Sequence, residues 1–134
     1  ILGWLDESEV NCLEKTTLTS DALSRILMPL VVKSTGIRAQ FIRLSSTKIL
    51  VAELRVTAGL DVLSQVNEGV LVYTVDMTIP TGKGGWSVQR GPNSIQDDFT
   101  DAALKTGNSI TVEGIKIEVV FQNSNSAEIR FSQN

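Results

Sequence analysis

Histidine is missing from the 134-residue sequence, and its absence excludes several kinds of catalytic site. A Ser-His-Asp triad, a Cys-His dyad and a histidine-ligated zinc site all need imidazole groups. Histidine is also the commonest general acid or base in enzymes. We therefore expect no catalytic activity from this chain by itself.

Cysteine is represented by Cys12 alone. A lone cysteine forms no disulfide within the chain and cannot complete a four-ligand structural zinc site. Its neighbours Asn11 and Leu13 carry no charge that would stabilise a thiolate. Because free cysteine is among the most buried residue types, we predict that Cys12 is a buried structural residue.

An excess of positive charge and long apolar segments are also lacking. Twelve basic and fifteen acidic residues give a net charge of −3, which has the wrong sign for a nucleic-acid-binding surface. No apolar run approaches the roughly 20 residues that span a bilayer. We expect neither a nucleic-acid partner nor a membrane span.

The residues that are present favour strands. Val and Ile are prominent from residue 26 onward, and β-branched residues are enriched in strands. Apolar residues alternate with polar ones along several segments, as in half-buried strands. Residues 69–77 are apolar on both sides at their start, which predicts a central strand. The expected strands are residues 26–32, 37–43, 48–56, 69–77, 109–112, 115–121 and 127–132.

These strands predict an all-β fold, an antiparallel β-sandwich of about seven to eight strands, jelly-roll-like or Ig-like. Residues 109–112 and 115–121 should form a hairpin around Glu113-Gly114. At most one short helix is expected, over residues 20–27, and a loop over residues 80–99. We place a linker, or the end of a preceding domain, at residues 1–12 and the sandwich at residues 13–134.

Charged residues supply few candidates for a site. Asp97, Asp98 and Asp101 lie close in sequence and are candidate calcium ligands, since calcium takes oxygen ligands from carboxylates and carbonyls. The alternative is that they are solvated loop charges. Glu53 and Arg55 share one face of a strand, where cross-strand ion pairs are expected rather than a catalytic site.

Aromatic residues make up 5% of the sequence, and two of them are tryptophans. Trp86, in the expected glycine-rich loop, is the candidate for stacking against the apolar side of a sugar ring. Trp4 belongs to an apolar N-terminal cluster with Leu2 and Leu5. Apolar clusters of this kind mark interfaces, so these three residues are the candidate interface.

Several motifs occur in an order that resembles a known family. The Leu-Gly-Trp segment at residues 2–10 resembles the stretch that leaves the catalytic domain of secreted zinc metallopeptidases of the immune inhibitor A type. Residues 28–30 and then 36–44 resemble that family's first sandwich strands, and residues 51–55 resemble its Val-x-Glu-x-Arg pattern. Residues 59–61 follow as its Gly-Tyr/Phe-Asp motif, with Leu60 in place of the aromatic residue. Residues 68–76 resemble its Gly-Val-Leu-Val-Tyr-x-Val-Asp strand, and residues 101–109 with the hairpin after them resemble its closing strands.

The resemblance implies a role without catalysis for this chain. The family's zinc ligands lie in a His-Glu-x-x-His helix and a third position upstream of the sandwich, so no catalytic residue carries over. The implied function is that of a C-terminal sandwich domain that supports or docks to its own zinc-dependent protease domain. Secretion, and zinc in the catalytic domain, are likewise implied by the family; calcium is the one cofactor considered for this chain.

Two other classes of function remain as alternatives. An extracellular carbohydrate-binding or adhesion module would need an aromatic or calcium-dependent binding face, and its partner would be a glycan or a protein. A small independent enzyme is disfavoured by the absence of histidine.

Overall fold

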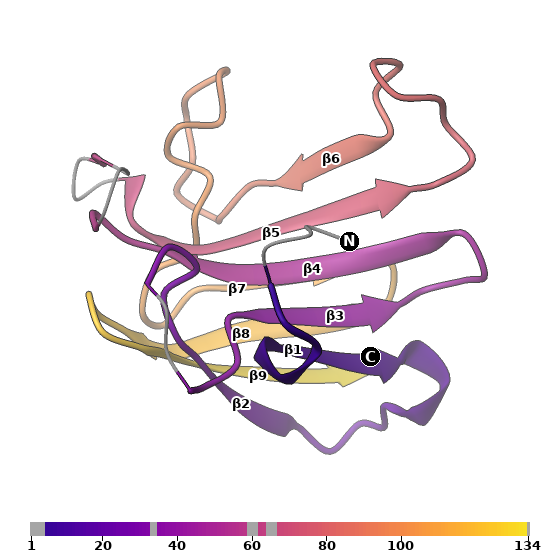
Figure 1. Ribbon diagram of the computed structural model, residues 1–134, viewed down its shortest axis with the longest axis horizontal. Coiled ribbons are helices and arrows are strands. Elements are labelled where there is room, and N and C mark those ends of the chain that lie inside the picture. Colours follow the sequence, from indigo (N-terminus) through magenta and orange to yellow (C-terminus); the bar gives the residue numbers. More distant parts are fainter. Residues whose placement is uncertain (1–4, 33–34, 59–61, 64–66, 134) are drawn as a thin grey trace.

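The computed structural model describes residues 5–32, 35–58, 62–63 and 67–133 and has two layers of β-sheet (Figure 1). The predicted all-β sandwich is confirmed, with nine strands in the described residues and no α-helix among them. Two short 3-10 helices, Glu7–Glu9 and Lys15–Thr17, flank the first strand. The strands are β1 Val10–Glu14, β2 Leu23–Leu27, β3 Ala39–Arg43, β4 Lys48–Arg55, β5 Gly69–Asp76, β6 Trp86–Gln89, β7 Ser109–Val112, β8 Ile115–Gln122 and β9 Ala127–Gln133.

The strands form a five-stranded and a four-stranded sheet. The five-stranded sheet has the order β1-β3-β4-β5-β6, and the four-stranded sheet has the order β2-β9-β8-β7. All neighbouring pairs are antiparallel except β1 and β3, which run parallel. The predicted central strand is β5, which lies between β4 and β6.

Aliphatic side chains fill the space between the sheets. Leu50, Leu54 and Val72 of the five-stranded sheet and Ile117 and Ile129 of the four-stranded sheet expose none of their surface. Full burial of such a side chain stabilises the fold by about 1.5–3 kcal/mol. The inward positions alternate along each strand, so this core uses one face of each sheet.

The predicted hairpin is confirmed. β7 and β8 pair with Val112 opposite Ile115, and Glu113 and Gly114 form the turn with φ values of 47° and 82°. Two successive positive φ values are those of the type I′ turn, whose twist matches that of the flanking strands.

The helix predicted over residues 20–27 is wrong, because β2 occupies its second half and pairs with β9. Leu23 and Leu27 turn toward the core, whereas Ile26 is 49% exposed. Burial therefore follows the two-residue period of a strand instead of the helical stripe. The strand predicted over residues 26–32 starts earlier and ends earlier, and Pro29 forms only an isolated bridge with Leu54.

The first strand begins inside the segment that we assigned to a linker. β1 pairs with β3 from Val10 onward, and the Glu9 carboxylate lies 3.3 Å from the Arg38 guanidinium with both side chains almost fully buried. The Arg38 N–H also donates to the Glu9 carbonyl at 2.7 Å. Residues 9–12 are thus built into the edge of the five-stranded sheet.

Candidate functional site

The outer face of the five-stranded sheet, which points away from the four-stranded sheet, is apolar. Strand register places alternate residues of β3, β4, β5 and β6 on it. These residues form a second apolar cluster, separate from the core. The outer face comprises Ala39, Phe41, Ile49, Val51, Leu71, Tyr73, Val75, Trp86 and Val88. β4 and β5 are therefore apolar on both sides, which is unusual for an antiparallel sheet with a solvated face.

Two large side chains at one end of the outer face are strongly exposed. Trp86 and Met77 are each 60% exposed, and the Trp86 ring stacks on Tyr73 with centroids 5.1 Å apart and planes at 20°. With Phe41 and Val75 they border a hollow of about 120 Å³. Its wall is almost wholly apolar, so it suits an apolar side chain rather than a polar ligand.

Trp86 does not lie in a loop as predicted, because it is the first residue of β6. Pairing with β5 places it opposite Val75. Since Tyr73 covers one face of the indole ring, at most one face remains for a sugar. The geometry supports an apolar contact surface better than a stacking strip.

A buried polar cluster lies among the apolar residues of this face. Glu53 is 3% exposed, accepts a hydrogen bond of 3.0 Å from the Tyr73 hydroxyl and lies 3.2 Å from Arg55 Nη1. Burial, then the Glu53 charge, raises the pKa of Tyr73 well above its ordinary value. Glu53 and Arg55 thus pair with each other along β4, and the cross-strand partner of Glu53 is the tyrosine. A buried carboxylate with a hydrogen-bond partner and an ion-pair partner has a structural role.

Leu5 is the residue of the N-terminal candidate interface that the structure describes, and it lies on the outer face. Leu5 packs against the apolar cluster beside Val10. Leu2 and Trp4 lie outside the described residues. The Asp6 N–H donates to the Glu9 carboxylate at 2.9 Å, and this turn leads into β1. The segment therefore approaches the sandwich on its outer face.

The predicted burial of Cys12 is wrong, because the residue is exposed. β1 is an edge strand, and Cys12 lies opposite Phe41 on the outer-face side of the sheet. Burial statistics for cysteine reflect cores, whereas this position faces away from the core. No further element of the described chain covers it.

The three candidate calcium ligands do not converge. Asp98 accepts hydrogen bonds from the Thr100 N–H and hydroxyl, and the exposed Asp97 lies 3.8 Å from Arg90. Asp101 accepts from the Ser94 hydroxyl at 2.7 Å and from backbone N–H groups of its loop. These bonds lower the pKa of Asp101. Within the described ranges, no group of three or more acidic or cysteine side chains is placed to hold a metal ion.

Comparison with models of known protein families, with curated proteins and with solved structures finds no match for this chain. In the described part of the chain, no helix has the length and apolar character needed to cross a membrane.

Proposed function

We propose that this chain is a non-catalytic docking domain, the β-sandwich that follows the catalytic domain of a secreted zinc metallopeptidase and packs against it. The observation that carries the proposal is the apolar outer face of the five-stranded sheet. Phe41 and Tyr73 in the middle of this face are buried, whereas Trp86 and Met77 at one end of it are each 60% exposed, and in the described residues no further sheet packs on it.

The composition of the outer face is that of an interface centre. Phe41, Tyr73 and Trp86 are aromatic and Met77 is flexible, and these residue types are enriched in protein–protein interfaces. Of these aromatic residues Trp86 is the exposed one, and a large exposed aromatic residue beside an apolar hollow is a usual anchor of binding energy. Solvent exposure of Trp86 and Met77 is costly in an isolated domain and is relieved when a partner covers them.

The position of the N-terminal segment favours the preceding domain as the partner. Leu5 and Val10 lie on the outer face, so a domain joined before residue 1 would be delivered to this side of the sandwich. The resemblance of residues 2–10 to the exit from a zinc metallopeptidase domain supports the same partner. Zinc and the secreted location belong to the proposal through that resemblance, and all zinc ligands would come from the partner domain.

The experiment compares two substitutions in the protein expressed with its preceding domain. Trp86→Asp places a charge at the proposed contact, and Ile26→Asp places one on an exposed residue of β2 in the other sheet. Thermal unfolding with separate probes for each domain should show that Trp86→Asp uncouples the two transitions and that Ile26→Asp leaves them coupled. Equal behaviour of the two variants would overturn docking through the outer face. A preceding sequence without a His-Glu-x-x-His motif would overturn the zinc metallopeptidase domain as the partner.

A further inference from the structure

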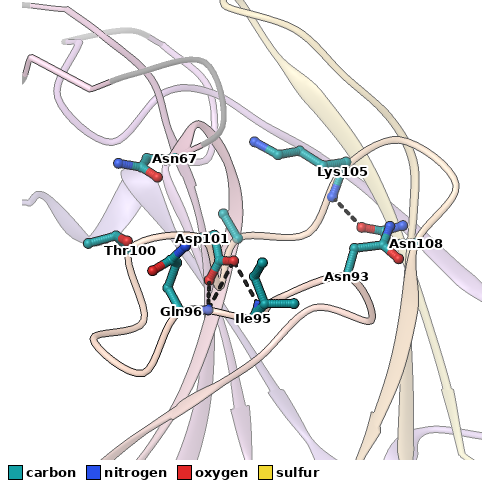
Figure 2. Close-up of a pocket in the computed structure, with 9 residues that line it drawn as sticks. Asn67, Asn93, Ile95, Gln96, Thr100, Asp101, Lys105 and Asn108 are labelled. Atoms are coloured by element: carbon teal, nitrogen blue, oxygen red, sulfur yellow. Dashed lines mark hydrogen bonds between the residues drawn. The ribbon is translucent and has the colours of Figure 1, made fainter.

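A polar pocket lies at one end of the sandwich, formed mainly by the connection between β6 and β7 (Figure 2). It encloses about 500 Å³, and its polar wall residues are Asn67, Asn93, Gln96, Thr100, Asp101, Lys105 and Asn108. A smaller hollow of about 230 Å³ shares Asn67, Thr100 and Ala103 with it and adds Phe99 and Arg55. We call the two together the loop pocket. It has a different chemistry from the apolar hollow beside Trp86.

The connection that forms the loop pocket is held in one conformation by its own contacts. Asp101 accepts hydrogen bonds from the backbone N–H groups of Ile95 and Gln96, as Figure 2 shows. Arg90 donates to the Gln96 carbonyl and lies 5.1 Å from the centre of the Phe99 ring. The Gly91 N–H and the Ala102 carbonyl close the base of the loop at 2.8 Å. A wall fixed in this way loses little entropy when it binds a ligand.

The side-chain amides of the wall are available to a ligand. Those of Asn67, Asn93 and Gln96 make no hydrogen bond with any described residue, and the Asn108 oxygen accepts the Lys105 N–H at 2.9 Å. Each carboxamide offers both donors and an acceptor. Three such groups around one hollow match a ligand that carries several hydroxyl groups, since a hydroxyl also donates and accepts.

The charges of the wall favour an acidic ligand. Among the described residues lining the two hollows, Asp101 is the one carboxylate, and its oxygens are already occupied by the loop. Lys105 lines the same space; burial lowers its pKa, while the nearby Glu68 carboxylate acts in the opposite direction. A carboxylate on the ligand would add to the attraction that the Glu68 carboxylate already exerts on the Lys105 ammonium.

We propose that the loop pocket binds a short acidic saccharide, with ring hydroxyls on the carboxamides, the sugar carboxylate toward Lys105, and Phe99 as the apolar platform. Phe99 is 44% exposed and has a φ of 62°, a backbone conformation that bulky residues rarely adopt, and with Arg90 over one face of its ring the other face is the platform. The inference is independent of the docking role of the outer face.

The test is a titration of the purified chain with three probes, followed by the side-chain amide signals of Asn67, Asn93 and Gln96 in nuclear magnetic resonance spectra. The probes are tetragalacturonate, neutral cellotetraose and a tetraglutamate peptide. We expect tetragalacturonate to bind tightest and to shift these signals. Absence of shifts with both saccharides, or equal or tighter binding of the peptide at the same amides, would overturn the proposal.

Variants separate the hydroxyl contacts from the charge contact. The double substitution Asn93→Ala with Gln96→Ala should weaken tetragalacturonate binding about tenfold or more, whereas Asn125→Ala, in the turn between β8 and β9, should leave it unchanged. Lys105→Met should reduce tetragalacturonate binding to the level of cellotetraose. Unchanged binding of tetragalacturonate in the double variant would refute the carboxamide contacts. An unchanged preference of Lys105→Met for tetragalacturonate over cellotetraose would refute the role of Lys105 in acidic specificity.

Discussion

Tyr73 is the one tyrosine of the sequence, so its ionisation can be followed directly through the near-ultraviolet absorbance of the phenolate. Its burial and its hydrogen bond to the Glu53 carboxylate raise its pKa above the ordinary value of about 10. The folded state therefore holds the phenolic proton more tightly than the unfolded chain. The resulting stability is present in full below pH about 10 and is lost as the pH rises above it. We expect Tyr73 to ionise only as the protein unfolds in alkali.

Two substitutions separate the causes of this shift. Glu53→Gln removes the negative charge but leaves the burial, so the pKa of Tyr73 should fall while staying above its ordinary value, because burial is the larger cause. Tyr73→Phe removes one hydrogen bond from a buried carboxylate and should lower the free energy of unfolding by about 1.5–3 kcal/mol. Urea denaturation at neutral pH measures that loss. A Tyr73 that titrates near pH 10 in folded protein would refute the geometry of the Glu53 cluster.

Three further predictions concern the core, a turn and the loop pocket. Leu54→Ala should lower the free energy of unfolding in urea by about 2–5 kcal/mol, against less than about 1 kcal/mol for Ile26→Ala; equal losses would contradict the assigned core. Gly114→Ala puts a side chain at a φ of 82° and should cost about 1–2 kcal/mol by the same assay; a neutral effect would argue against the type I′ turn. Asp101→Ala should lower the thermal midpoint of unfolding and make that midpoint fall less steeply as the pH drops below about 4. The reason is that Asp101, with its lowered pKa, loses its stabilising contribution as the pH falls through that range. Asp97→Ala should change neither quantity, and a larger effect of Asp97→Ala than of Asp101→Ala would contradict the loop contacts.

Alternating patterns in the sequence located most of the strands. Residues 48–56 and 115–121 carry apolar residues at every second position, and they became β4 and β8, the longest strands along with β5. Such periodicity is a local property, so it can be found without knowing what a strand pairs with. The two-sided apolar pattern of residues 70–73 correctly predicted a central position for β5.

Features that depend on distant partners could not be predicted in this way. The spacing of Leu23, Ile26 and Leu27 suits a helix as well as a strand, and the choice is made by β9, about a hundred residues later, where Phe131 pairs with Leu23. Cys12 was misplaced because its exposure depends on which edge β1 occupies. The strand β6 was missed because it is short and lies within a glycine-rich segment.

The candidate sites depended even more on register. Phe41, Tyr73 and Trp86 share the outer face only because β3, β4, β5 and β6 pair in one particular register, and a slip of one residue would turn each to the other side. The three aspartates, which are neighbours in sequence, instead take separate partners in the folded loop. The carboxamides of the loop pocket carry no sequence signal, since asparagine and glutamine are common in loops.

The central claim is that the outer face docks against the domain that precedes this chain, and Cys12 provides the most direct test. The thiol is exposed beside Phe41 on that face, so its rate of alkylation by N-ethylmaleimide, read by mass spectrometry of the Cys12 peptide, reports whether the face is covered. An introduced cysteine, Ile26→Cys, on the exposed side of β2 serves as the control. The account predicts that Cys12 reacts readily in the isolated chain and is protected when the preceding domain is present, while the cysteine at position 26 reacts equally in both. Equal alkylation of Cys12 in the two proteins would contradict it.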